Sequence, residues 1–110
     1  MSARLASGLW VSAYLARLRL ADIPAYVTAK GDATAGAVVV KCATLDGCAR
    51  AWQRSYDFAT DRRIWVLLAE GPEAEVDISV TRARTSDRDL WVIELEDRAG
   101  RNLLDEPGLE

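Results

Sequence analysis

Hydrophobic residues recur with helical spacing near the start of the chain. At about 100° per residue, Trp10, Tyr14 and Leu18 fall on one side, whereas Ser12 and Arg19 lie opposite. The pattern predicts an amphipathic helix from about Leu9 to Ala21. The helix ends before Ile23-Pro24, because the residue before a proline avoids helical geometry. Its aromatic residues lie on the apolar side, which favours a role in the core.

Alternating apolar and polar positions replace the helical spacing after Pro24. Residues 25–30 are typical of a short strand, and the small residues from Gly31 to Gly36 predict a loop. The stretch from Ala35 to Tyr56 reads as two strands joined at Asp46-Gly47, a dipeptide that is a strong hairpin signal between apolar runs. We expect the rest of the domain to be organised around this hairpin.

The number of residues in the hairpin loop decides which side chains share a face. A loop of two or four residues places Val38, Val40 and Cys42 on one face, and Lys41, Arg50, Trp52 and Arg54 on the other. A three-residue loop would place Arg50 and Arg54 beside the valines, where burying each unpaired guanidinium group costs roughly several kcal/mol. We therefore predict the even loop, which also puts Cys42 and Cys48 on opposite faces and forbids a disulfide between them.

The second half of the chain contains one ambiguous segment. Residues 64–68 form an apolar run typical of a central strand buried on both faces, and residues 90–96 alternate as a strand. Between them, Pro72 followed by acidic residues predicts the start of a helix to about Thr85, yet residues 75–81 alternate and are rich in β-branched side chains. Local chemistry favours the helix. Residues 102–104 would return as a brief edge strand.

These elements predict an α+β fold, a single two-layer domain over residues 1–110. It would contain a mostly antiparallel, meandering sheet with two helices packed on one face. The predicted core consists of ten large apolar residues: Trp10, Tyr14, Leu18, Val38, Val40, Trp65, Leu67, Trp91, Ile93 and Leu95.

The chain resembles a small bacterial family, the domain-of-unknown-function family number fourteen ninety-one. The resemblance is carried by short stretches in order along the chain: Trp10-Val11-Ser12-Ala13, Lys30-Gly31-Asp32, Ala35 to Val38, Leu45-Asp46-Gly47, Asp61-Arg62-Arg63, Pro72 to Asp77, Asp89 to Glu94, Glu96-Asp97-Arg98 and Gly100-Arg101. None of these is a catalytic signature, and the family implies no activity, cofactor or functional residue. The resemblance favours a helix after Pro72, although residues 78–81 are weaker helix formers than that family leads one to expect.

Composition removes several chemistries. The 110 residues include no histidine, which excludes Ser-His-Asp and Cys-His catalysis and imidazole-dependent zinc sites. The net charge of −3 gives no overall attraction to nucleic acid or anionic membranes. No signal peptide is visible, and no apolar run approaches the roughly 20 residues that span a bilayer. We expect a cytoplasmic protein with both cysteines as thiols and no cofactor.

Two candidate sites offer chemistry, each with a simpler explanation. Glu94, Glu96 and Asp97 could hold a divalent cation, but alternating acids on a half-buried strand are usually only its solvated face. Cys48, beside the turn, could act as a nucleophile but has no histidine base, whereas Cys42 on the valine face would be buried and inert. We predict no catalytic residue and no metal site.

The leading hypothesis is a non-catalytic accessory or protein-interaction module. On the even register, Lys41, Arg50, Trp52 and Arg54 form a basic, aromatic surface that binds a protein partner or another copy of the chain. One alternative is a metal-dependent enzyme that uses the three carboxylates on a phosphate-containing substrate. Another is a small nucleic-acid binder, since Arg and Trp also stack on bases.

Overall fold

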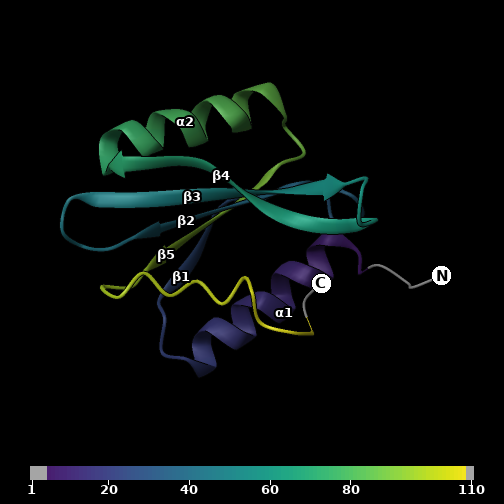
Figure 1. Cartoon of the computed structure of the whole chain (residues 1–110), viewed down its shortest axis with the longest axis horizontal. Helices are drawn as coiled ribbons and strands as arrows, with labels where there is room; N and C mark the ends of the chain where they lie inside the picture. Colours follow the sequence, from purple (N-terminus) through teal and green to yellow (C-terminus); the bar gives the residue numbers. More distant parts are fainter. Residues whose placement is uncertain (1–4, 109–110) are drawn as a thin grey trace.

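One five-stranded sheet lies between two helices (Figure 1). The structure is a computed structural model that describes residues 5–108, the side chain of Tyr56 excepted; residues 1–4 and 109–110 of the predicted domain lie outside it. The elements in chain order are α1 (Ser7–Leu20), β1 (Ala25–Ala29), β2 (Val38–Ala43), β3 (Cys48–Asp57), β4 (Arg62–Pro72), α2 (Glu73–Ser86) and β5 (Trp91–Glu96). The α+β class is confirmed.

The strand order is β1-β5-β2-β3-β4. β2, β3 and β4 form an antiparallel meander, and β1 is antiparallel to β5. β5 returns to the middle of the sheet and pairs parallel with β2. The sheet is therefore mostly antiparallel, as predicted, with a parallel pair at its centre.

The two helices pack on opposite faces of the sheet, which corrects the prediction of two layers with both helices on one face. α1 lies below the sheet in Figure 1 and α2 above it. The core beneath α1 contains Trp10, Val11, Tyr14, Leu18, Ile23, Val38, Val40, Cys42, Trp91, Ile93 and Leu95. The core beneath α2 contains Val39, Ala49, Ala51, Val76, Val80, Leu90 and Val92. The sheet supplies both cores because β2 and β5 carry apolar residues on both faces.

The centre of the sheet is β2 and β5, not residues 64–68. All of β2 is buried, whereas residues 64–68 belong to β4 at the edge of the sheet. Eight of the ten predicted core residues are buried; Trp65 is half-buried, and Leu67 is 46% exposed. The apolar run in β4 looked central because sequence alone does not show that a strand lacks a neighbour.

The helix predicted after Pro72 is present, so its helical start signals outweigh the alternating pattern that follows. Its buried residues are Val76 and Val80, four positions apart, and Ile78 points outward with 53% of its surface exposed. The predicted edge strand at residues 102–104 is absent. That segment instead crosses α1, where the Tyr14 hydroxyl donates a hydrogen bond to the Asn102 carbonyl at 2.7 Å.

Candidate functional site

The β2–β3 turn is a three-residue loop, so the prediction of an even loop is wrong. Val40 lies opposite Trp52 and Cys42 opposite Arg50, while Lys41 lies opposite Ala51. Directly opposed residues share a face. Arg50, Trp52 and Arg54 therefore lie on the α1 face and Lys41 on the α2 face. The four residues predicted to bind a partner do not form one surface.

The turn itself explains this register. Leu45 and Gly47 have positive φ angles of 61° and 92°, and a positive φ at the last loop position, as at Gly47, is common in three-residue hairpin loops. The carboxylate of Asp46 accepts hydrogen bonds from the Thr44 hydroxyl at 2.6 Å and from the Cys48 amide at 3.1 Å. These bonds hold the pKa of Asp46 below its usual value, the Thr44 bond contributing most. The aspartate therefore fixes the loop from within.

The two arginines on the α1 face meet the burial cost that argued against this register in different ways: Arg50 avoids it, whereas burial lowers the pKa of Arg54. Arg50 is exposed and its Nε lies 3.1 Å from a carboxylate oxygen of Glu70. The guanidinium of Arg54 stacks on the ring of Trp10, with its Cζ 4.9 Å from the ring centroid. Trp52 is half-buried against the core beneath α1. The indole expected to face a partner is thus partly covered by the protein itself.

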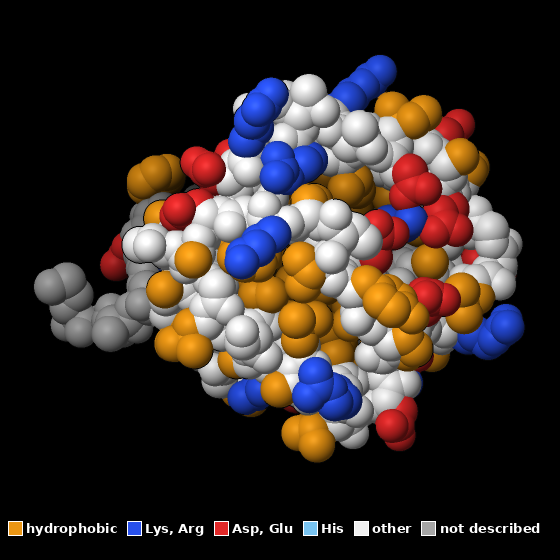
Figure 2. Space-filling view, turned by 180° about the vertical axis from the view of Figure 1, so that it is seen from behind, with side chains coloured by type: hydrophobic (Ala, Val, Ile, Leu, Met, Phe, Trp, Pro, Cys, Tyr) orange, Lys and Arg blue, Asp and Glu red, His pale blue; other side chains and the backbone are white. Residues whose placement is uncertain are grey.

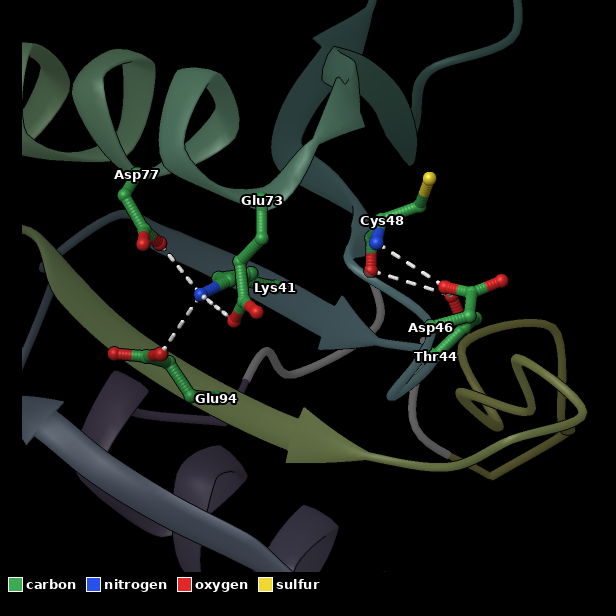
Figure 3. A network of polar contacts seen from close by, with 7 residues as sticks. All are labelled: Lys41, Thr44, Asp46, Cys48, Glu73, Asp77 and Glu94. Carbon is green, nitrogen blue, oxygen red and sulfur yellow. Dashed lines mark hydrogen bonds and ion pairs between the residues drawn. The ribbon is translucent and has the colours of Figure 1, made fainter.

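Among residues 5–108, Lys41 is the buried cation (Figure 3). Its Nζ donates hydrogen bonds to Asp77 at 2.5 Å, Glu73 at 2.7 Å and Glu94 at 3.2 Å. Burial acts to lower the pKa of Lys41, but the three carboxylates outweigh it and raise the pKa above its usual value. Lys41 therefore stays charged and ties the start of α2 to β2 and β5. From behind, acidic side chains gather around a basic one on the surface (Figure 2).

Two of the three carboxylates of the metal hypothesis have separate partners. Glu94 binds Lys41, whereas Asp97 accepts hydrogen bonds from the backbone amide of Arg101 at 2.7 Å and from its guanidinium at 2.9 Å. Hydrogen bonds from Arg101 hold the pKa of Asp97 below its usual value. Within residues 5–108, no three His, Cys, Asp or Glu residues are grouped so that they could hold a metal ion.

Both cysteines lie on the α1 face, which corrects their predicted placement on opposite faces. They line one cavity of about 500 Å³, together with Trp52, Arg50 and Arg98. Both are free thiols; Cys42 is buried and Cys48 exposed. Burial and the charge of Asp97 raise the pKa of the Cys42 thiol. The burial of Cys42 is as predicted, and we expect its thiol to be unreactive.

β4 is an open edge of the sheet. In the part of the chain that the structure describes, no strand pairs with its outer side. Ile64, Val66 and Leu67 are 39%, 46% and 46% exposed. No charged residue occurs between Arg63 and Glu70. An edge strand whose middle is uncharged and carries exposed apolar side chains is a site for pairing with another chain.

Sequence reasoning missed three features of the molecule: the acids around Lys41, the open edge of β4, and the like charge of Arg63, which contributes to the lowered pKa of Arg54. One signal was present, because Glu73 and Asp77 are four residues apart on one side of the predicted helix. Their cationic partner lies more than thirty residues away in sequence, and only the fold brings it close.

Similar proteins support the fold throughout its length. Residues 5–105 match the model of the family described as "Protein of unknown function (DUF1491)". A DUF1491 family protein from Caulobacter crescentus CB15 is 37% identical over 96% of this chain and 97% of its own. Its crystal structure gives a TM-score of 0.83 and its NMR structure 0.84. The solution structure of protein Atu0922 from A. tumefaciens is 31% identical, covers 86% of both chains and has a TM-score of 0.70.

No curated protein matches the chain. None of the helices in residues 5–108 is long and apolar enough to span a membrane. The family match covers most of the sequence, and the solved structures are similar to this chain in both fold and amino-acid sequence. The chain therefore belongs to the DUF1491 family, a family of unknown function.

Proposed function

We propose that this protein is a non-catalytic interaction module that binds a second copy of itself through β4. The observation that carries the proposal is the open edge between Arg63 and Glu70. An eleven-residue strand with an unpaired outer side can add another strand through backbone hydrogen bonds. The other edge strand, β1, has only five residues and a register shift at Val27–Ala29; β4 also has a register shift, at Leu68, but its stretch from Arg62 to Leu67 pairs regularly with β3.

The sequence of β4 is complementary to itself in antiparallel pairing. If two copies pair with Val66 opposite Val66, Arg62 of one copy comes near Glu70 of the other, because each is four residues from Val66; the register shift at Leu68 displaces Glu70 by one position, and Glu70 also pairs with Arg50 of its own chain. The apolar residues between them then lie opposite one another. Opposite charges at the ends and apolar side chains in the middle favour this register over shifted ones. A two-fold interface uses the same surface on both copies, as this pairing does.

The polar groups of the molecule support a binding role rather than catalysis. The chain has no histidine, and the amine of Lys41 is held by three carboxylates. Cys48 is exposed at the turn without an imidazole to activate it. A cytoplasmic location, where the two cysteines remain thiols, belongs to the same proposal.

The test is the mass of the purified protein in solution, measured by light scattering over a range of concentrations. We expect the mass of two chains at micromolar concentration. Ile64→Lys with Val66→Lys should give the mass of one chain, because paired edges would bring the new charges together. Ile78→Lys is the matched control, since it places a lysine at an exposed apolar position on α2. A single-chain mass for the unmodified protein, or no effect of the β4 variant on a dimer, would overturn the proposal.

A further inference from the structure

The α2 side of the sheet is left open over β1. α2 packs mainly over β4 and β3, at the other end of the strand order. Tyr26 of β1 lies opposite Glu94 of β5, and the next residue of β5 on the chain, Leu95, belongs to the core beneath α1. Successive side chains of a strand point to opposite faces, so Tyr26 and Glu94 face the α2 side. Tyr26 is 54% exposed there.

A groove runs between α2 and this open part of the sheet. It consists of two adjoining cavities of about 270 and 320 Å³, which share Thr28 and Glu94 in their walls. Small and apolar residues form much of the lining, among them Ala29, Ala43 and Val92. Tyr26 and Leu45, the latter 45% exposed, lie at one end. The groove therefore offers apolar surface that no other part of the described chain covers.

The walls of the groove carry carboxylates with oxygens to spare. Glu73 and Asp77 extend from α2, and Glu94 extends from β5, toward Lys41 (Figure 3). Each of the three gives one oxygen to the Lys41 ammonium. Their side chains are 42%, 52% and 35% exposed. Within residues 5–108 the second oxygen of each accepts no hydrogen bond, so it remains open to a partner in solution.

The charges of the groove do not balance. Glu96 lines it beside Glu94, on the same face of β5, and pairs with no cation among the described residues. Arg84 lies at the opposite end, where its guanidinium donates a hydrogen bond to the Lys30 carbonyl at 3.3 Å. Four carboxylates thus share the groove with Lys41 and Arg84. In Figure 2 these acidic side chains adjoin hydrophobic ones on the surface.

We propose that this groove binds an extended segment of a partner protein that carries Lys or Arg at alternate positions. Alternate side chains of an extended chain lie roughly 6.6 Å apart, which is also the spacing of Glu94 and Glu96 on β5. Glu73 and Asp77 are one helical turn apart, about 6 Å along α2. Two rows of carboxylates with this spacing match successive cationic side chains, and the Tyr26 ring offers a face for a cation or its apolar stem.

This surface is separate from the one proposed for self-pairing. The groove borders β1 and β5, whereas β4 is the opposite edge of the sheet. Binding in the groove therefore leaves the outer side of β4 free, and the two proposals stand or fall independently.

The simpler alternative is that the acids serve only to hold Lys41. Glu96 separates the two explanations, because it lines the groove without bonding to Lys41. If the acids serve only the lysine, replacing Glu96 changes no binding. If the groove holds a basic segment, the same replacement weakens it.

The experiment measures the fluorescence anisotropy of a labelled peptide of about six residues, roughly 20 Å when extended, in which lysine alternates with threonine. We expect saturable binding of one peptide per chain that weakens as salt is raised. A peptide of the same composition with its lysines adjacent should bind more weakly, because its charges no longer match the spacing of the acids. Equal binding of the two peptides, or equally tight binding of spermidine in competition, would overturn the proposal of an extended protein segment.

Variants locate the effect. Asp77→Asn with Glu96→Gln should weaken binding about tenfold, as loss of two exposed charge pairs does. The matched control is Glu75→Gln with Asp105→Asn, which removes the same charge from exposed positions outside the groove and should change binding less than twofold. Tyr26→Ala tests the apolar end and should also weaken binding.

NMR spectra recorded during titration with the alternating peptide show where it binds. Amide signals of Thr28, Leu45 and Glu96 should move, and that of Ser55 on β3 should not. The proposal is wrong if the unmodified protein does not bind the alternating peptide, or if the groove variant and its matched control lose affinity equally. It is also wrong if the same signals move with protein concentration in the absence of peptide, because a second copy of the chain would then occupy the groove.

Discussion

Val40 lies directly opposite Trp52 across the β2–β3 pair, and both side chains contact the core beneath α1. This relationship makes Trp52 a structural residue. We predict that Trp52→Ala lowers the free energy of unfolding by about 2 kcal/mol, less than for a fully buried tryptophan because the indole is only half-buried. Urea unfolding measures this loss of stability, and Trp52→Phe should lower the free energy of unfolding less than Trp52→Ala does. An unchanged midpoint for Trp52→Ala would show that the indole is not part of the core.

The buried ion cluster gives a second prediction. Lys41→Met leaves Glu73, Asp77 and Glu94 close together without their shared cation. We expect a loss of about 2 kcal/mol in the free energy of unfolding, since removing one partner leaves like charges facing one another. Arg50→Met is the control, because it breaks an exposed pair and should cost less than about 1 kcal/mol. Equal losses in the free energy of unfolding for the two variants would contradict a stabilising role of the buried Lys41 cluster.

The pair formed by Asp97 and Arg101 predicts a dependence on pH. Because Arg101 lowers the folded-state pKa of Asp97, the carboxylate contributes stability at pH values above its unfolded pKa of about 3.9. That contribution is lost as the pH falls through the lower, folded pKa. Between pH 5 and pH 2, the free energy of unfolding should therefore fall less with decreasing pH for Asp97→Asn than for the parent protein. The same pH dependence for both proteins would show that the ion pair of Asp97 and Arg101 does not contribute to stability.

The two cysteines should differ sharply in reactivity. Cys48 is exposed, whereas Cys42 is buried and its Sγ lies 3.9 Å from the Arg101 carbonyl oxygen. We predict that a maleimide labels Cys48 much faster than Cys42 in the native protein, and that both react at similar rates in denaturant. Mass spectrometry after digestion assigns the label. Fast labelling of Cys42 under native conditions would indicate that the segment after β5 opens readily.

Gly31 lies where a side chain has no room. A Cβ at this position would clash with the Asp89 carbonyl oxygen and approach the Trp91 ring to 2.7 Å. We predict that Gly31→Ala lowers the free energy of unfolding by about 3 kcal/mol, because the neighbours are mostly backbone and cannot move aside cheaply. A fall in the melting temperature measures the effect, and Gly8→Ala, where contacts are no closer than 3.4 Å, is the control.

The parts of the fold that local chemistry decides were predictable. The spacing of Trp10, Tyr14 and Leu18 indicated α1, and Pro72 with the acids after it indicated α2. The placement of those helices on opposite faces was not predictable, because it depends on β2 and β5 being apolar on both sides and lying next to each other.

The hairpin register failed for a specific physical reason. An arginine whose side chain lies beside a valine was expected to be buried and unpaired. Arg50 instead reaches solvent and Glu70, and Arg54 stacks on an indole supplied by α1. The cation that is buried is Lys41, whose partners come from α2 and β5. Distant residues decided the cost of each charge, and a single strand pair does not reveal them.

The position of β5 affects how the protein acquires its structure during synthesis. β5 follows the other four strands in the chain, yet it lies between β1 and β2. Until the ribosome has released residues 91–96, β1 has no neighbour and β2 presents one unpaired side. The hairpins β2–β3 and β3–β4 can form early because their contacts are local, while the centre of the sheet closes last. A nascent chain halted before Trp91 would therefore expose an open seam in the middle of the sheet, where chaperones or other unfinished chains can bind.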